Sequence, residues 1–186
     1  MSEQARKKWN GIHARATSPV VPQTWLQIWL PALERGRRAL DVACGRGGIS
    51  IFLAKRGYLV DAFDISSVAL ASLQQRIDAD ELSIRCRSFD LDSEPLPQHL
   101  YALIHCSHYL DYDLMSVLKE RLQPGGRLIT EHYGMENLAR HKRPSERYLV
   151  RSERMHHALS GLQLLFEFEG WAESHYVHRF VWERVA

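Results

Sequence analysis

The fold of this chain is decided by one stretch, Ala39-Leu40-Asp41-Val42-Ala43-Cys44-Gly45-Arg46-Gly47-Gly48. An apolar run enters the stretch, glycines at positions i and i+2 stop that run from continuing as a strand, and an amphipathic segment follows. We therefore predict a strand, a tight turn and a helix. In an open α/β sheet, such a turn lies at the carboxyl end of a strand, where helix N–H groups and bare backbone can approach a ligand. The stretch thus indicates a small-molecule cofactor site.

Strand and helix patterns alternate after this turn. The expected strands are Arg38 to Ala43, Tyr58 to Phe63, Leu82 to Phe89, Tyr101 to Cys106 and Arg127 to Thr130, and the expected helices are Ile49 to Arg56, Ser67 to Ile77 and Leu114 to Leu122. Alternation of this kind predicts parallel β-α-β units with right-handed crossovers. Two further strands, Leu162 to Glu169 and Glu173 to Val185, are joined through Gly170-Trp171-Ala172 and predict an antiparallel hairpin. The predicted fold class is α/β: a Rossmann-like, mostly parallel sheet of seven strands, with helices on both faces and this C-terminal hairpin.

The regions before and after this core predict a single domain over residues 1–186. The polar stretch from Trp9 to Pro22 contains two X-Pro pairs that disfavour helix, so we expect an irregular arm. Thr24 is expected to cap a helix that ends at Gly36, although Pro31 is badly placed inside it. We assign residues 1–22 to an N-terminal arm or lid, 23–131 to a cofactor-binding core, and 132–186 to a substrate lid and the hairpin.

Composition narrows the class of protein. With 45% apolar and 25% charged residues, the 186-residue chain is typical of a globular domain, and no apolar run reaches the length of a membrane span. The first residues lack the apolar core of a secretory signal, and three cysteines at long spacing favour reduced thiols, so we expect a cytoplasmic protein. The net charge of +2 predicts neither a nucleic-acid partner nor a membrane partner. The oligomeric state stays open.

Three acidic residues end three consecutive predicted strands. Asp41 precedes the glycine turn, Asp64 follows it by about 20 residues at the end of the second strand, and Asp90 closes the third strand. A carboxylate at the second position can accept hydrogen bonds from both hydroxyls of a ribose, and one at the third can accept from an adenine amine. Each of these residues alone could instead cap the following helix. Together they predict a nucleoside site.

The neighbours of these carboxylates narrow the ligand. Ile65 and Leu91 directly follow two of the aspartates and are expected to cover the faces of the adenine ring. Ser50 stands where dinucleotide-binding turns have a third glycine, and a pyrophosphate is disfavoured beside Asp41. Both observations favour a ligand with a cationic end.

The motifs resemble a known family in their residues and in their order. Leu40-Asp41-Val42-Ala43-Cys44-Gly45-Arg46-Gly47 resembles the first motif of class I S-adenosylmethionine-dependent methyltransferases, and Val60-Asp61-Ala62-Phe63-Asp64-Ile65-Ser66 resembles the second. Leu122-Gln123-Pro124-Gly125-Gly126-Arg127-Leu128 is similar to their turn into strand five. The resemblance covers half of the chain. The compact length, with the Trp9-Asn10 arm and the Gly57-Tyr58 entry to the second strand, is most similar to the tellurite-resistance-type branch.

This resemblance implies S-adenosyl-L-methionine as the cofactor and a small-molecule methyl acceptor. It implies that Gly45 and Gly47 admit the methionine part, and that Asp41 helps to fix the methionine amino group. It also implies that Asp64 holds the ribose, that Asp90 holds the adenine amine, and that Cys106 lines the pocket beside the sulfonium. The predicted cofactor-binding residues are Trp9, Asp41, Ala43, Gly45, Gly47, Asp64, Ile65, Asp90, Leu91 and Cys106. Ala43 departs from the family pattern, because many members have glycine there.

The sequence constrains the catalytic residues less than it constrains the cofactor-binding residues. Methyl transfer is an in-line displacement that alignment and water exclusion can accelerate, and a base is needed only for a protonated acceptor. We predict His108, Tyr109 and His132 as the catalytic residues and interpret His105 as a hydrogen-bonded core histidine. No metal is predicted, because the histidines lack metal-ligand spacing. Two alternatives remain: a non-catalytic, regulatory S-adenosylmethionine-binding module, and an NAD-dependent oxidoreductase.

Overall fold

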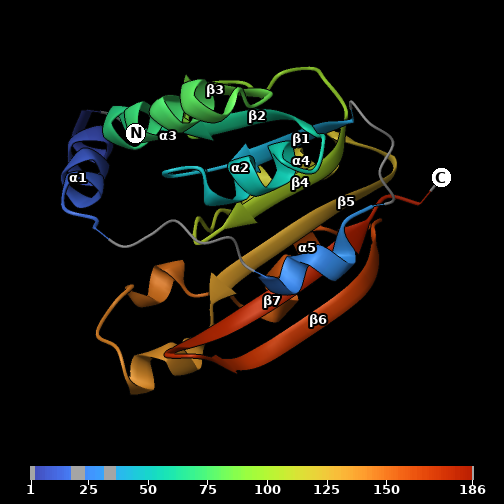
Figure 1. Cartoon of the computed structure of the whole chain (residues 1–186). Helices are drawn as coiled ribbons and strands as arrows, with labels where there is room; N and C mark the ends of the chain where they lie inside the picture. The colour runs from blue at the N-terminus through green and yellow to red at the C-terminus, as the bar shows by residue number, and fades with distance from the viewer. Residues whose placement is uncertain (1–2, 18–23, 32–36, 186) are drawn as a thin grey trace.

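The computed structural model describes residues 3–17, 24–31 and 37–185, and these form a sheet flanked by helices (Figure 1). The strands are β1 (Arg38–Val42), β2 (Leu59–Asp64), β3 (Ile84–Ser88), β4 (Tyr101–Ser107), β5 (Leu122–Tyr133), β6 (Gln163–Ala172) and β7 (His175–Glu183). The helices are α1 (Glu3–Ala14), α2 (Gly48–Ala54), α3 (Ser67–Asp80), α4 (Tyr112–Lys119) and α5 (Ser152–Ala158), with 3-10 helices η1 (Thr24–Trp29), η2 (Met135–Ala139) and η3 (Glu146–Tyr148). Within the described ranges, no helix has both the length and the apolar character to cross a bilayer.

The sheet confirms the predicted fold class. Its strand order is β3-β2-β1-β4-β5-β7-β6, so that the strand carrying the glycine turn lies near the middle. The first five strands in this order pair in parallel, whereas β7 pairs antiparallel with both β5 and β6. The order reverses at β1, where the chain goes first to β2 and later returns to β4. Ligands of open α/β sheets bind at such a reversal, beyond the carboxyl ends of the strands.

Two apolar clusters cover the two faces of the sheet. One contains side chains of α4 and α5, packed on the face that carries Leu40 and Cys106. The other contains side chains of η1, α2 and α3, packed on the face that carries Ala39 and Ile129. Because side chains alternate along a strand, neighbouring positions on β4 and β5 face different clusters. This alternation decides where each histidine of the two strands lies.

The N-terminal arm differs from the prediction, because α1 is a regular helix over Glu3–Ala14. Glu3 and Lys7 form an i,i+4 ion pair with 3.5 Å between carboxylate and ammonium, and Ala5 is buried. The prolines that disfavour helix come later, at residues 19 and 22, outside the described residues. The helix expected from Thr24 to Gly36 is a 3-10 helix that ends at Trp29, before Pro31. Residues 32–36 also lie outside the described part.

The hairpin turn is also displaced from its expected position. Gly170-Trp171-Ala172 continues β6, in which Trp171 pairs with Tyr176 and Ala172 with His175. The turn is therefore formed by Glu173 and Ser174, with Glu173 in the left-handed region at φ 53°. The prediction failed because a glycine was taken as the turn signal. In the structure, Phe168 packs over Gly170, where an added Cβ would lie 3.0 Å from the ring.

Candidate active site

The glycine turn connects β1 to α2 in a conformation that side chains tolerate poorly. Gly45 and Gly47 have φ angles of 52° and 76°, and Ala43 has 53°. A Cβ on Gly47 would lie 2.3 Å from Leu73 of α3, and a Cβ on Gly45 would lie 3.3 Å from the His13 ring of α1. The turn thus packs closely between α1 and α3. Glycine is favoured at both positions because a side chain would contact these helices and would be strained at a positive φ. Ala43 adopts the left-handed conformation at the position where the sequence departs from glycine.

Asp64 is tied to this turn by hydrogen bonds. Its Oδ2 accepts from the Gly45 backbone N–H at 2.8 Å, and its Oδ1 accepts from the Ser66 N–H at 2.7 Å. The residue is only 7% exposed, and this burial raises the pKa of its carboxyl group, while the two N–H donors oppose the rise. Each carboxylate oxygen can accept a further hydrogen bond. Asp64 is thus held rigidly beside the turn with acceptor capacity left over.

Helix α1 covers the outside of the turn. Asn10 Oδ1 accepts from the Ser66 hydroxyl at 2.8 Å and from the Val68 N–H at 3.3 Å, which anchors α1 to the start of α3. His13 lies against Gly45, and burial lowers the pKa of His13 while Asp64 opposes that effect. Trp9 lies one turn earlier on α1, with 6.2 Å between its ring centroid and that of His13. Its contact with a cofactor stays a prediction.

The other predicted nucleoside residues lie at the same edge of the sheet. The Phe89 N–H donates to the Asp64 carbonyl at 2.9 Å, so the segment after β3 runs beside the end of β2. Asp90 follows directly, half-buried, and its Oδ1 accepts from the Asp92 N–H at 3.1 Å. Ile65 and Leu91 are half-buried beside the two aspartates. The structure thus brings the predicted ribose and adenine residues to one edge.

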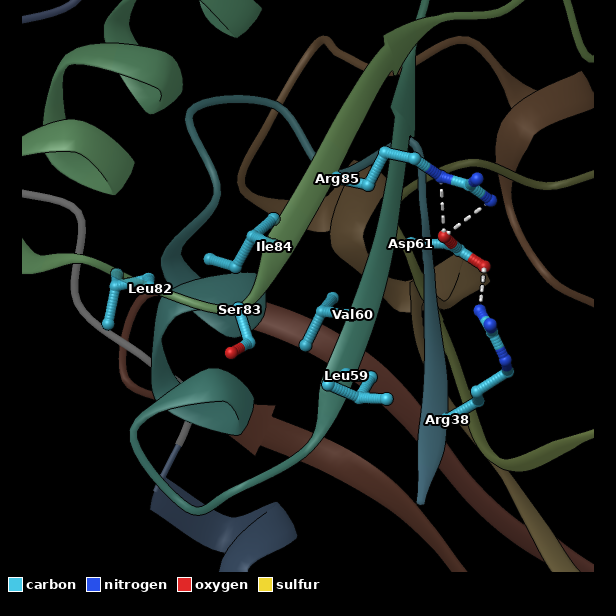
Figure 2. A pocket seen from close by; sticks show the side chains of 8 residues that line it. All are labelled: Arg38, Leu59, Val60, Asp61, Leu82, Ser83, Ile84 and Arg85. Carbon is cyan, nitrogen blue, oxygen red and sulfur yellow. Dashed lines mark hydrogen bonds and ion pairs between the residues drawn. The ribbon is translucent and has the colours of Figure 1, made fainter. Parts of the chain in front are cut away.

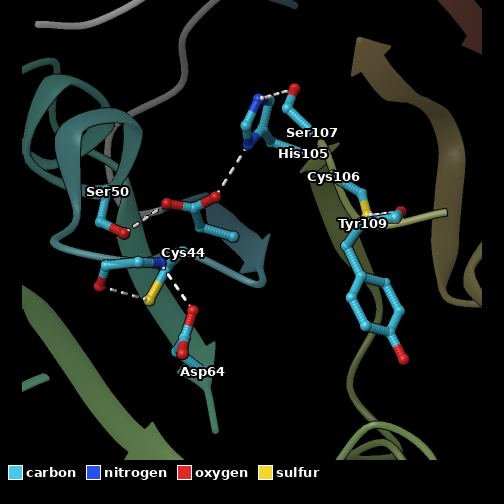
Figure 3. Close-up of polar contacts among 9 residues, drawn as sticks. Cys44, Ser50, Asp64, His105, Cys106, Ser107 and Tyr109 are labelled. Carbon is cyan, nitrogen blue, oxygen red and sulfur yellow. Dashed lines mark hydrogen bonds and ion pairs between the residues drawn. The ribbon is translucent and has the colours of Figure 1, made fainter. Parts of the chain in front are cut away.

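Asp41 is the centre of a polar network that lies under the turn. It is 1% exposed, and its Oδ2 accepts from the Ser50 hydroxyl at 2.5 Å while its Oδ1 accepts from His105 Nδ1 at 2.8 Å. The other ring nitrogen of His105 lies 2.8 Å from the Ser107 hydroxyl. Figure 3 shows the two side chains pointing toward one another. Both oxygens of Asp41 therefore already have a partner within the protein. Its role toward a methionine amino group stays a prediction.

Two of the predicted catalytic residues follow β4 at the exposed end. His108 has φ 59°, stacks on Tyr133 with 4.6 Å between ring centroids, and places Nε2 3.4 Å from Glu131 Oε1. Its packing lowers its pKa, while Glu131 opposes the change. The Tyr109 hydroxyl donates to Asp92 at 2.7 Å, and burial raises the pKa of Tyr109. The catalytic role of Tyr109 stays a prediction.

The third predicted catalytic residue, His132, lies on the opposite face of β5 from Tyr133, the ring that stacks on His108. It is 1% exposed, and neither ring nitrogen has a hydrogen-bond partner among the described residues. Burial lowers its pKa to about 3. Along β5 it shares a face with Thr130, which pairs with Cys106 on the α4 side of the sheet. Cys106 is also fully buried, with its Sγ 3.4 Å from the Tyr109 carbonyl, and burial raises its pKa.

Comparison with known proteins finds similarity to one family over part of the chain. A family model described as "Methyltransferase domain" matches residues 39–126, from the glycine turn to the start of β5. Residues 39–126 are therefore similar to a methyltransferase domain, which supports the predicted resemblance. "Putative methyltransferase YqeM" of Bacillus subtilis is 42% identical over 57 residues, which are 31% of this chain and 22% of that protein. The chain thus spans about a fifth of the length of this relative.

Two solved structures share the fold of the methyltransferase domain. TehB from Haemophilus influenzae has a TM-score of 0.69 at 16% identity, covering 80% of this chain and 58% of that chain. Magnesium protoporphyrin IX methyltransferase from Synechocystis, solved with bound SAH, has a TM-score of 0.67 at 21% identity. That match covers 97% of this chain and 83% of the other. The likeness therefore extends beyond residues 39–126 to the C-terminal hairpin.

A hollow of about 330 Å³ lies at the other edge of the sheet, away from the turn (Figure 2). It is lined by the first residues of β1, β2 and β3, and the buried Asp61 is its polar centre. Arg38 and Arg85 approach this carboxylate to 3.6 and 2.9 Å, and the Tyr101 hydroxyl donates to it at 3.0 Å. These groups satisfy one another and stabilise the amino ends of the strands. The hollow is thus separate from the glycine turn.

Sequence reasoning missed the pairing of His105 with Asp41 and Ser107. Asp41 and His105 are direct neighbours in the parallel register of β1 and β4. The signal was available, because the two residues occupy matching places near the ends of two buried strands. Reading it required knowing that β4 lies beside β1. Among the described residues, no group of three or more metal-ligating side chains is arranged to hold a metal ion.

Proposed function

We propose that this protein binds S-adenosyl-L-methionine at the carboxyl ends of β1, β2 and β3 and transfers its methyl group to a small-molecule acceptor. The hydrogen bond between the Gly45 N–H and Asp64 carries this proposal. It joins a bare backbone turn to a buried carboxylate that keeps free acceptor capacity. The similarity of residues 39–126 to the methyltransferase domain family supports it, as does the SAH bound in a solved protein of the same fold.

The residues at this edge fit such a cofactor. A side chain at Gly45 would fill the space beside His13, so glycine there keeps an approach open to the backbone. Asp64 can accept from ribose hydroxyls with its remaining lone pairs, and the half-buried Asp90 can accept from an adenine amine. These carboxylates favour hydroxyl and cationic groups over phosphates. When bound, the cofactor supplies a methyl group on a positively charged sulfur, which is a good leaving group.

The protein's part in the reaction is alignment and exclusion of water. Asp64 and the turn fix one end of the site, and α1 covers it through Asn10 and His13. Holding two reactants in line can contribute most of the acceleration of a displacement reaction. We place the acceptor beyond β4 and β5, at the carboxyl edge next to β1.

Aromatic rings line that part of the molecule. His108 stacks on Tyr133, Tyr133 lies 5.2 Å from His175, and His175 stacks on His141 with 4.7 Å between centroids. This aromatic ladder joins β4, β5, the segment after β5 and β7. Flat rings provide contact area for a planar or apolar small molecule. The porphyrin substrate in the name of the Synechocystis enzyme is a planar small molecule, a class of acceptor that such rings could contact.

Calorimetric titration with S-adenosylhomocysteine tests the proposal. We expect the wild-type protein to bind it and Gly45→Val to lose binding, because the added side chain fills the turn and is strained at φ 52°. Gly161→Val is the matched control: its glycine also has a positive φ, 92°, but nothing lies within 4 Å of an added Cβ. It should be strained to a similar degree and still bind. Normal binding by a folded Gly45→Val variant would contradict the proposal.

The same titration separates the rival functions. Tight NAD binding without S-adenosylhomocysteine binding would favour an oxidoreductase. S-adenosylhomocysteine binding without turnover on any acceptor in a panel of phenols, thiols and amines would favour a regulatory module.

A further inference from the structure

The network beneath the turn contains a carboxylate, an imidazole and a hydroxyl in one line. Asp41 Oδ1, the His105 ring and Ser107 Oγ are connected by two hydrogen bonds of 2.8 Å each. Asp41 and His105 are buried, at 1% and 5% exposed, whereas Ser107 is half-buried. Only the hydroxyl end of the line is thus open to a ligand. Asp41 is also a predicted cofactor-binding residue, whereas His105 and Ser107 have no part in the function proposed above.

The chemistry of the three groups fixes where the protons lie. An ionised carboxylate only accepts, so the Nδ1 of His105 carries a hydrogen and donates it to Asp41. In the neutral imidazole Nε2 then has no hydrogen, and the Ser107 hydroxyl donates its single proton to it. The second oxygen of Asp41 is held by Ser50, which keeps the carboxylate from turning. The lone pairs of Ser107 Oγ therefore point away from His105 and can accept a hydrogen bond.

Ser107 lies between the two halves of the proposed site. It is the last residue of β4, which pairs with β1 on one side, where β1 leads into the glycine turn. On the other side it is in register with Glu131 of β5, and the next residue, His108, begins the aromatic ladder. A small molecule resting on that ladder would meet the Ser107 oxygen on its way to the turn.

We propose that Asp41, His105 and Ser107 form a proton relay that deprotonates a hydroxyl-bearing acceptor, an alcohol or a phenol, during methyl transfer. This inference rests on the proposed function. As the acceptor's O–C bond forms, the S–C bond breaks and its electron pair goes to sulfur. The acceptor's proton passes to Ser107 Oγ, and the proton of Ser107 passes to His105 Nε2. The imidazolium is stabilised by Asp41 and returns its proton to water after the product leaves.

The relay selects the class of acceptor. A thiolate or another anionic acceptor needs no base, and it would be repelled by the lone pairs of Ser107. A neutral hydroxyl donates one hydrogen bond, which the single open oxygen of Ser107 can accept. In this scheme Ser107 contacts the acceptor, His105 takes up the proton through Ser107, and Asp41 is the positioning residue that holds the His105 ring.

The charged and titratable groups near His105 come from β1, from β5 and from His108, which directly follows β4. Asp41 of β1 is in direct contact, and Glu131 of β5 lies on the same face. Glu131 is paired with Arg179 of β7 at 2.6 Å and with His108 at 3.4 Å, so its charge is largely balanced. His132 of β5 faces the other side of the sheet and stays neutral. Asp41 is therefore the charged group in direct contact with the His105 ring.

The experiment places a thiol at the open end of the relay through Ser107→Cys. In a relay, His105 withdraws the thiol proton, so the thiol pKa should fall by at least about 1 below its ordinary value of about 8.5. The pKa is measured from the rate of iodoacetamide alkylation against pH, and mass spectrometry identifies the alkylated residue. The native thiols give little background, because burial raises the pKa values of Cys44, Cys86 and Cys106.

Three further variants make the result specific. Adding His105→Gln, or Asp41→Asn where that variant folds better, should return the thiol pKa to its ordinary value or above. Ser93→Cys places a thiol on an exposed loop, where the pKa should be ordinary. An ordinary pKa in Ser107→Cys, or a lowered one that persists without His105, would overturn the relay. Titration of the wild type with S-adenosylhomocysteine is a separate measurement, so a failed proposed function is told apart from a failed relay.

Discussion

The two buried histidines on neighbouring strands, His105 on β4 and His132 on β5, differ in everything except their burial. They are 5% and 1% exposed. His105 faces the side of α2, where both of its ring nitrogens have partners. His132 faces the side of α4 and α5, where neither ring nitrogen has a partner among the described residues. Burial alone therefore does not identify a catalytic base, because the partners of the ring decide whether it can take up a proton.

The difference arises from the alternation of side chains along the strands. His105 lies beside Asp41 in the register of β1 and β4, so a carboxylate is available to stabilise a positive ring. His132 lies beside His178 in the register of β5 and β7, so its neighbour is another imidazole. Burial, followed by His108, His105 and His178, lowers the pKa of His132 to about 3. At neutral pH its ring is a neutral packing group.

The strongest test of this comparison replaces each histidine by leucine and measures the free energy of unfolding in urea at neutral pH. His105→Leu should destabilise the protein by about 3 kcal/mol, because it leaves the buried Asp41 carboxylate with Ser50 as its hydrogen-bonding partner in this network. His132→Leu removes no hydrogen bond and should change stability little. Equal losses in the two variants would contradict the comparison.

The second test asks whether the cofactor site lies on the side of the sheet that His105 faces. Asp64→Ala should weaken S-adenosylhomocysteine binding by one or two charge-assisted hydrogen bonds, each about 1.5 to 3 kcal/mol, or at least about tenfold in the dissociation constant. Asp80→Ala is the control, because that carboxylate pairs with Lys55 at the far end of α3. Calorimetry measures both variants. Unchanged affinity in a folded Asp64→Ala protein would refute the ribose assignment.

The same carboxylate predicts a pH dependence of binding. Burial raises the pKa of Asp64 above the ordinary value for aspartate, with the N–H groups of Ser66 and Gly45 opposing the rise. The carboxylate therefore takes up a proton at a higher pH than an exposed aspartate does. We expect the affinity for S-adenosylhomocysteine to fall on acidification while exposed aspartates are still ionised. An affinity that held constant down to the ordinary pKa of about 3.9 would contradict this.

Most of the fold was predictable because its signals are local. Strands and helices are specified by short patterns, each of which extends over a few neighbouring residues. These patterns are the apolar runs, the turn at Gly45 and Gly47, and the amphipathic segments between strands. The errors arose where a local signal had two meanings. Gly170 indicates a turn, but in the structure it makes room for Phe168 within a strand. The prolines at 19 and 22 indicate irregular structure, but they do not reach back to α1.

The site was predictable only in part. The nearness of Asp64 to Gly45 follows from one β-α-β unit, and its hydrogen bond joins residues 19 apart. The bond between Asp41 and His105 joins residues 64 apart and depends on the order of strands in the sheet. The side of the sheet that His132 faces depends on the register of β5, which already starts at Leu122, before Pro124 and the two glycines. The sequence places those glycines in a turn. The first residue of β5 is therefore not defined by the sequence, and neither is the face of the sheet to which each later side chain of the strand points.

The last test of the comparison is the pH dependence of the His132→Leu variant. In the unfolded chain His132 takes up a proton near its ordinary pKa of about 6.5, whereas in the folded protein the pKa is about 3. Between these values the unfolded state binds the extra proton, so wild-type stability falls as the pH drops through this window. At about pH 5.5 the loss from this residue is about 1.4 kcal/mol, and His132→Leu should avoid it. Urea unfolding at neutral pH and at pH 5.5 should therefore show a growing advantage of the variant. An advantage that does not change with pH would mean that the ring has found a partner for its proton, and His132 would then resemble His105.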